Sequence, residues 1–334
     1  MESDLIDTHL LLTFVTVADS TSFTEASARL GVTQSAVSQA LKQLERIVGS
    51  ELIIRRSRPL RLTAAGQILK NSGETILADL RRLNANLRDV SDKALIQCRL
   101  GLVTSCSEVF GSGLIAALGD RIERLTLRSG MTPTLVQAFL DREIDVLVSS
   151  DPLPDVGGVE RFHLCRDPMM LVCSESMLRR VAPKGGHANA AIIHRLAESV
   201  PLIRYGRNTH IGALSEVALR RANILANLRY ETDDTHTLIR FVQAGHGWAV
   251  LSGLCLAQVL THARGIVAIE LDSSRHARDI YLTAREGELG SIPGQVAMEI
   301  REIFQSEIYP QLKRAAPWVR KSDFLDSTEE GNGL

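Results

Sequence analysis

Residues 22–45 read SFTEASARLGVTQSAVSQALKQLE, and this stretch predicts two short helices joined by a tight turn. Ser22 is placed to cap the first helix, and Glu25, three residues later, would complete a capping box. Gly31 can adopt the positive φ that ends a helix, and Thr33 is a favourable cap for the helix that follows. The stretch is therefore typical of a helix-turn-helix.

The second of these helices has two different faces. Val37, Leu41 and Leu44 recur at helical spacing, so they are predicted to face the core. The other face and the cap carry hydrogen-bonding side chains that can reach base edges and phosphates, namely Thr33, Gln34, Ser35, Ser38, Gln39 and Lys42. Taken alone, this stretch leaves open an amphipathic hairpin whose outer face is merely polar.

The following residues 49–63, GSELIIRRSRPLRLT, change from helical to extended character. Residues 52–54 and 60–62 are predicted to form the strands of a wing, whose tip would hold three arginines, Arg55, Arg56 and Arg58. The chain has a net charge of −1, yet residues 29–70 contain eight bases and two acids. A basic segment beside a recognition helix is the charge distribution that DNA binding requires, although the tip could also be a solubilising loop.

Residues 64–92 are predicted to form one long helix with a heptad seam. The apolar residues of this seam are Leu69, Ile76, Leu80, Leu83, Leu87 and Val90. Such a seam is typical of a coiled coil, so this helix is predicted to pair two subunits and to place two recognition helices on one DNA face. Gly73 interrupts the seam and is a candidate bend.

The first sixty-six residues resemble the winged helix-turn-helix of LysR-type transcriptional regulators. The matching positions are Phe14, Val17, Ala18, Ser22, Phe23, Ala26, Leu30, Thr33, Gln34, Ser35, Ala36, Val37, Ser38, Leu41, Leu44, Glu45, Gly49, Leu52, Arg55, Arg58, Leu62, Thr63, Ala65 and Gly66. Ser27 and Ile53 depart from the usual residues of the family, and both look like packing substitutions.

From residue 99 onward, short strands alternate with helices, which predicts an open parallel sheet with helices on both faces. Segments 159–164 and 169–173 are predicted strands that cross into a second lobe, and 266–271 and 280–283 are predicted to return to the first lobe. A long helix over about 293–314 would cover the first lobe, and the polar, acidic tail after Pro317 is predicted to be disordered.

This half resembles the effector domain of LysR-type regulators, which is itself similar to periplasmic solute-binding proteins. The clearest marker is the segment 242–251, VQAGHGWAVL, in which Trp248 replaces a small aliphatic residue. The resemblance implies an α/β fold with an N-terminal winged helix-turn-helix, a long linker helix and a two-lobed periplasmic-binding-protein-like effector domain. The expected parts are a DNA-binding domain at 1–64, a linker (dimerisation) helix at 65–92, an effector domain at 93–317 and a polar tail at 318–334. Lobe 1 would span about 99–160 and 266–317, and lobe 2 about 161–265.

An effector is expected between the lobes, beyond the carboxyl ends of the strands. Small hydroxyls at a helix N-terminus make an anion site, which suits a carboxylate. The candidate residues at these strand ends are Thr104, Ser105, Cys106, Ser149, Ser150, Arg204, Tyr205, Thr232, Asp233 and Trp248. Trp248 could instead fill the core.

The five cysteines show no CxxC pair and no His spacing typical of zinc, and an odd number of scattered thiols fits a reducing cytosol. We find no signal peptide and no apolar run of membrane-spanning length, and we expect neither a metal nor a cofactor. Redox sensing through Cys106 remains an alternative, as does an enzyme with an appended DNA-binding domain. No G-x-S-x-G, phosphate loop or H-E-x-x-H motif supports the enzyme.

The sequence therefore predicts a cytoplasmic, non-enzymatic regulator of transcription. The resemblance implies that a homodimer, or a tetramer built as a dimer of dimers, binds an imperfect palindrome in double-stranded DNA and responds to a small organic effector. RNA polymerase would be a further partner, and no contact with a membrane is expected.

Overall fold

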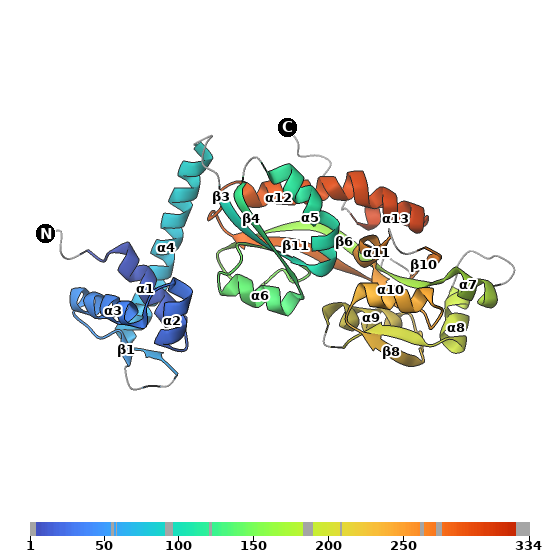
Figure 1. The fold of residues 1–334 in the computed structure, drawn as a ribbon, viewed down its shortest axis with the longest axis horizontal. Helices are drawn as coiled ribbons and strands as arrows, with labels where there is room; N and C mark the ends of the chain where they lie inside the picture. The colour runs from blue at the N-terminus through green and yellow to red at the C-terminus, as the bar shows by residue number, and fades with distance from the viewer. Residues whose placement is uncertain are drawn as a thin grey trace. The chain divides into compact units, whose positions relative to one another are not determined.

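A computed structural model of the chain describes residues 5–54, 57, 59–90, 96–119, 122–182, 190–207, 209–260, 264–271 and 276–324. The chain forms two compact units (Figure 1). The first comprises residues 1–92 with 287–290, and the second comprises residues 93–286 with 291–334.

The first unit is built from three short helices, a two-stranded wing and one long helix. Its elements are α1 (Thr8–Ala18), α2 (Phe23–Leu30), α3 (Gln34–Val48), β1 (Ile53–Ile54), β2 (Arg61–Leu62) and α4 (Ala64–Val90). The core between α1, α2 and α3 includes Phe14, Val37 and Leu44, all of them fully buried. The two helices and the wing lie where the sequence predicts them, but each wing strand is one residue shorter at its start.

The turn between α2 and α3 is fixed by local capping. The Ser22 hydroxyl accepts a hydrogen bond from the Glu25 N–H at 3.2 Å, and Gly31 ends α2 at φ 66°. Thr33 caps α3 by accepting from the Ala36 N–H at 3.2 Å. The predicted capping box differs in one detail, because the Glu25 carboxylate accepts from the N–H of Thr21, at 2.8 Å, rather than from that of Ser22.

Helix α4 runs without interruption past Gly73, so that glycine is explained by close packing rather than by a bend. A Cβ at Gly73 would lie 2.8 Å from Leu11 Cδ1, which shows how closely α1 approaches α4 there. Beyond this contact the predicted seam is exposed within a single chain, with Ile76, Leu83 and Leu87 each about half exposed or more. Leu69 packs against the core and Leu80 is half-buried, whereas the side chain of Val90 lies outside the described residues.

The first lobe of the second unit is an open sheet covered on both faces. Its strands are β3 (Ile96–Val103), β4 (Ile122–Gly130), β5 (Val146–Ser149) and β11 (Ala277–Arg285). Strand β3 pairs in parallel with β4 and β5, but β11 runs antiparallel to β5 and to β6 (Val159–Ser174), so the sheet is mixed and not wholly parallel as predicted. Helices α5 (Thr104–Leu118) and α12 (Ile292–Ile303) lie on one face and α6 (Thr132–Leu140) on the other (Figure 1).

A single long strand, β6 (Val159–Ser174), leads into the second lobe. The sequence predicted two separate strands here. Residues 159–168 of β6 pair with β11, whereas residues 169–174 pair with β9 (Ala249–Ser252) and β10 (Ile266–Glu270). Strand β10 was expected to return to the first lobe; it instead remains beside the second half of β6, and only β11 returns.

The second lobe contains a small parallel sheet of β7 (Leu202–Tyr205) and β8 (Leu228–Thr232). Helices surround it, namely α7 (Glu175–Val181), α8 (Ala190–Ser199), α9 (His210–Arg221), α10 (Thr235–Gln243) and α11 (Gly253–Val259). Trp248 is fully buried in the core of this lobe, and its indole N–H donates to the Val200 carbonyl at 3.0 Å.

The C-terminal part corrects one expectation. Helix α12 continues through a π-helical segment, η3 (Phe304–Ile308), into α13 (Tyr309–Ala315), and a short 3₁₀ turn, η4 (Lys321–Asp323), follows. Residues 318–324 were expected to be disordered, yet they pack on the second unit, because Val319 and Phe324 are fully buried apolar anchors. The rest of the predicted tail, residues 325–334, lies outside the described residues.

Candidate functional site

The outer face of α3 presents the polar side chains that the sequence indicates. Gln34, Ser35, Gln39 and Lys42 are exposed and Ser38 is half-buried. This orientation follows from the burial of Val37, Leu41 and Leu44 on the opposite side. The Thr33 and Ser35 hydroxyls lie 2.9 Å apart and share a hydrogen bond at the start of the helix.

The wing is attached to α3 by a buried carboxylate. Glu45 Oε1 accepts from the Leu52 N–H at 3.0 Å, and the Thr63 hydroxyl donates to the Glu51 carbonyl at 2.7 Å. Recognition helix and wing are thus fixed to one another, as simultaneous contact with a groove and its flanking phosphates requires. Arg55, Arg56 and Arg58 lie outside the described residues.

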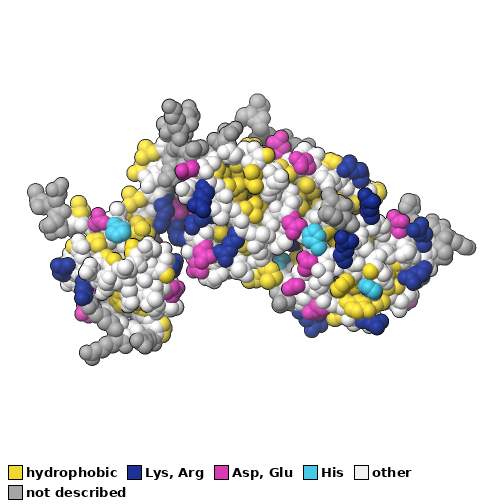
Figure 2. Space-filling view, in the orientation of Figure 1, with side chains coloured by type: hydrophobic (Ala, Val, Ile, Leu, Met, Phe, Trp, Pro, Cys, Tyr) yellow, Lys and Arg dark blue, Asp and Glu magenta, His cyan; other side chains and the backbone are white. Residues whose placement is uncertain are grey.

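Acidic and basic side chains are interspersed over the second unit on the face drawn in Figure 2.

A pocket of about 90 Å³ lies in the second unit, between its two lobes. Residues of both lobes line it, and six of the fourteen carry a hydroxyl group. They are Val103, Thr104, Ser105, Gly130, Met131, Thr132, Tyr205, Thr209, His210, Ile211, Asp233, Thr235, Cys255 and Arg278. A water molecule needs about 10–15 Å³ of such space, so the pocket can hold several waters or one small polar ligand.

Four helices begin at this pocket, and their first residues are Thr104, Thr132, His210 and Thr235. In the second lobe, α9 and α10 are capped by the side chains of Thr209 and Asp234. In the first lobe, α5 and α6 have no side-chain cap. The N–H groups of a first helical turn carry partial positive charge, so these two helices offer donors to a ligand oxygen.

Arg278 of β11 forms a buried ion pair at the base of the pocket. Its Nε donates to Asp167 Oδ2 at 2.8 Å, and its Nη2 donates to Ser105 Oγ at 2.9 Å. Burial opposes the charged form, but the facing carboxylate prevails and holds the pKa of Arg278 above its usual range. The hydrogen bonds of this guanidinium to described residues use Nε and Nη2, and Arg278 lines the pocket, so Nη1 can offer a donor to a ligand there.

His210 has a neutral ring at neutral pH. Burial lowers its pKa, and the nearby charge of Arg278 lowers it further. Its ring therefore adds no positive charge to the pocket, and its nitrogens can both accept and donate a hydrogen bond. Of the lining residues, Arg278 carries the positive charge and Asp233 contributes a carboxylate.

Of the predicted effector residues, the pocket brings together Thr104, Ser105, Tyr205 and Asp233. The other predicted residues do not line it, and these are Cys106, Ser149, Ser150, Arg204, Thr232 and Trp248. Arg204 and Tyr205 are neighbours on one strand, so their side chains point to opposite faces of the β7–β8 sheet. The Tyr205 hydroxyl donates to Thr235 Oγ1 of α10 at 2.9 Å, which leaves Arg204 facing α9.

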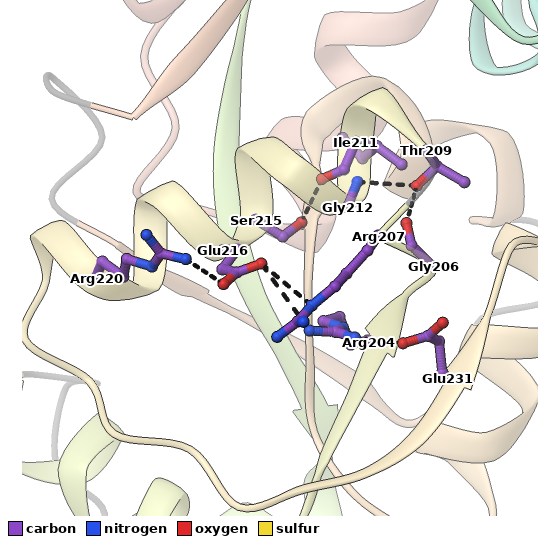
Figure 3. A network of polar contacts seen from close by, with 10 residues as sticks. All are labelled: Arg204, Gly206, Arg207, Thr209, Ile211, Gly212, Ser215, Glu216, Arg220 and Glu231. Carbon is purple, nitrogen blue, oxygen red and sulfur yellow. Dashed lines mark hydrogen bonds and ion pairs between the residues drawn. The ribbon is translucent and has the colours of Figure 1, made fainter.

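Arg204 belongs to a separate polar network on α9 and β8 (Figure 3). Its guanidinium binds Glu231, its cross-strand partner in the β7–β8 register, and lies 4.0 Å from Glu216. Glu216 also pairs with Arg207, at 3.8 Å, and with Arg220. The charge of Arg204 is thus compensated away from the pocket.

Sequence reasoning missed Thr132, Thr209, His210, Thr235, Cys255 and Arg278. Arg278 is one of several charged residues in β11, and β6 also contains several. Only the register of the two strands pairs Arg278 with Asp167.

The thiols of the second unit are poor candidates for oxidation chemistry. All five cysteines are free and buried. Burial raises the pKa of Cys98, Cys106 and Cys173 to about 12, so each of these is a protonated thiol at neutral pH. Within the described ranges, we find no group of three or more His, Cys, Asp or Glu side chains suited to a metal, and no helix long and apolar enough to cross a membrane.

Comparison with known proteins identifies both units. Residues 8–67 match the bacterial regulatory helix-turn-helix protein model of the lysR family, and residues 97–296 match the LysR substrate binding domain. The transcriptional regulator BbuR of Bordetella bronchiseptica is 26% identical over 317 residues, covering 91% of this chain and 93% of its own. CbbR of Rhodospirillum rubrum is 28% identical over 279 residues, covering 82% of this chain and 89% of its own.

Solved structures of low sequence identity share the fold. A cysteine-substituted full-length OxyR from Pseudomonas aeruginosa has a TM-score of 0.61 at 16% identity, covering 89% of this chain and 98% of its own. LysG from Corynebacterium glutamicum with bound effector arginine has a TM-score of 0.52 at 19% identity, covering 89% and 99%. The fold, the two family models and relatives that are named as regulators rather than enzymes agree: this chain is a DNA-binding transcriptional regulator and belongs to the LysR family.

Proposed function

We propose that this regulator responds to a small organic anion, most simply a carboxylate, bound in the pocket between the lobes. The observation that carries the proposal is that two helix N-termini without side-chain caps, those of α5 and α6, line the same pocket as Arg278, whose Nη2 donates to Ser105. A carboxylate there could accept from the Ser105 hydroxyl, from first-turn N–H groups and from Arg278 Nη1.

An effector in this pocket would act by changing how closely the lobes approach. Its contacts would come from α5, α6 and β11 on one side and from α9 and α10 on the other. A ligand shifts such an equilibrium only by its differential affinity for the two arrangements. A ligand that reaches both lobes has that differential affinity, because an open arrangement would lose half of its contacts.

The effector proposal is tested by a thermal-shift screen of the purified protein with acetate, glycolate, lactate, amino acids and benzoate. A ligand present at 100 times its dissociation constant stabilises by about 2.7 kcal/mol, which is readily detected. For any hit, Ser105→Ala should weaken binding roughly tenfold, because it removes a hydrogen bond to a charged group.

Two matched variants are controls for this screen. Ser107→Ala removes a hydroxyl one half-turn further along α5 that bonds Ser129 at 2.7 Å and does not line the pocket. Arg204→Ala removes a guanidinium of the second lobe that also lies outside the pocket. Both should leave affinity within about twofold. Equal losses in Ser105→Ala and Ser107→Ala would argue against binding at this site.

We further propose a division of roles in DNA binding. Gln34, Ser38 and Gln39 would read base edges, whereas Arg55, Arg56 and Arg58 of the wing would contact phosphates. Alanine at a reading position should then change the sequences selected from a random duplex library. Alanine at a wing arginine should weaken binding to all sequences and reduce the salt slope by about 1. Equal loss of specificity from both groups would contradict this division.

We also propose that α4 pairs two subunits. The support is the exposed apolar side chains of Ile76, Leu83 and Leu87, which a single chain leaves uncovered at heptad spacing. Pairing there would place two recognition helices on one palindromic site, in keeping with the predicted linker at residues 65–92.

A further inference from the structure

The C-terminal segment 317–324 is held by specific contacts with the effector domain. The indole N–H of Trp318 donates to the Ala268 carbonyl of β10 at 3.2 Å. Lys313 Nζ donates to the carbonyls of Pro317 and Val319, at 2.7 and 2.6 Å. These bonds fix the start of the segment against the strand that pairs with the second half of β6.

Phe324 ends the segment as a fully buried plug. Its ring centroid lies 5.0 Å from that of Phe304 and 6.5 Å from that of Tyr309, both on the helical run that continues from α12. Because α12 packs on α5, β6 and β11, the segment joins β10 of the second lobe to helices that cover the first.

Phe324 also lies close to Asp167, next to the backbone N–H groups of Arg166 and Leu254. The Arg166 N–H, immediately before Asp167, donates to the Phe324 carbonyl at 2.7 Å. At Gly253, a Cβ would lie 3.0 Å from the Phe324 ring and 3.1 Å from Asp167 Oδ1. The next residue, Leu254, donates its N–H to Asp167 Oδ1 at 2.9 Å. Gly253 therefore lies between the Phe324 ring and the Asp167 carboxylate and is close to both.

Asp167 in turn holds Arg278, whose other donors reach the effector pocket. A displacement of Phe324 would release the peptide before Asp167 and the first turn of α11 together. We propose that residues 317–324, through Phe324, form a positioning element that fixes the Asp167–Arg278 pair and the start of α11. The consequence of this inference for effector binding rests on the proposed effector site, whereas its test does not depend on that site.

The five buried cysteines provide a built-in reporter. Cys255 lies on α11, lines the pocket and is 3.9 Å from Arg278 Nη2. Cys98 on β3 and Cys173 at the end of β6 lie in other parts of the two lobes. Local loosening near Phe324 should expose Cys255, and can reach its neighbours Cys106 and Cys165, whereas global unfolding would also expose Cys98 and Cys173.

The experiment is alkylation of the full chain with iodoacetamide under native conditions, with the rate at each cysteine determined by peptide mass spectrometry. Phe324→Ala is expected to label Cys255 at least about tenfold faster than the unaltered protein, while the rates at Cys98 and Cys173 change less than about twofold. Phe324→Leu, which keeps an apolar plug, should stay near the original rate.

Gly253→Ala disturbs the same contact from the α11 side. Its added methyl group needs only a small shift of the Phe324 ring, so this variant tests the inference if Phe324→Ala fails to fold. It should also accelerate Cys255 selectively. Equal acceleration at all five cysteines, or none at Cys255 in either variant, would overturn the inference. Because labelling needs no effector, these results stand even if the anion screen finds no ligand.

Discussion

Arg278→Ala is expected to lower the stability of the effector domain by about 3–5 kcal/mol, because it leaves Asp167 as a buried carboxylate without its cation. Asp167 is fully buried and the Arg278 side chain is 7% exposed, so the carboxylate loses its cation in a site that is largely shielded from bulk solvent. The loss should appear as a lower midpoint of the effector-domain transition in urea unfolding of the full chain.

Two further variants separate charge from packing. Asp167→Asn combined with Arg278→Met removes both charges but keeps an acceptor for the Leu254 N–H, and should recover at least half of the loss. Arg204→Ala removes an equally buried guanidinium, yet its partners Glu216 and Glu231 are 28% and 48% exposed and can be hydrated. Its cost should be about 1 kcal/mol or less. If the double variant is no more stable than Arg278→Ala, packing rather than charge explains the effect.

The second large effect is expected in the DNA-binding unit. A Cβ at Gly66 would lie 2.1 Å from the Leu52 carbonyl oxygen, which is backbone and already accepts from the Thr63 N–H. Gly66→Ala must therefore displace either the start of α4 or the wing, at a cost of about 3 kcal/mol. We expect the melting temperature of this unit to fall by more than about 10 °C, measured by calorimetry. Binding to random duplex DNA at low salt should weaken in parallel.

Gly73→Ala on the same helix is the matched control. Its Cβ would meet the end of the Leu11 side chain at 2.8 Å, and a side chain can rotate away where a carbonyl cannot. Alanine also favours a helix interior over glycine by about 1 kcal/mol. The net change should be within about 1 kcal/mol of zero. A larger loss at Gly73 than at Gly66 would mean that the close approach of α4 to the wing is not what limits this unit.

The helix-turn-helix could be predicted because its determinants are local. Ser22, Gly31 and Thr33 act on backbone groups within a few residues, and the burial of Val37 and Leu41 follows from helical periodicity. The alternation of strands and helices in the effector domain was visible for the same reason.

Strand partners and the base of the pocket could not be predicted from local patterns. Arg278 and Asp167 are 111 residues apart, and no local feature assigns one to the other. Strand β10 is apolar and would fit either lobe, so only its register with β6 decides its place. In the tail, the polar average of the sequence concealed Val319 and Phe324, two anchors that suffice to dock the segment.

The position of the second lobe has a consequence for the order of folding. It is inserted between β6 and β11, which are adjacent antiparallel strands, and the Met169 N–H donates to the His276 carbonyl at 2.7 Å where the insertion begins and ends. Closing an unstructured connection of this length would cost about 4 kcal/mol of chain entropy. A folded second lobe removes most of that cost by holding its own ends together. During synthesis, the first half of β6 must then wait for the whole insertion before its partner β11 emerges. The sheet of the first lobe, which begins before the second lobe in the sequence, is therefore completed after it.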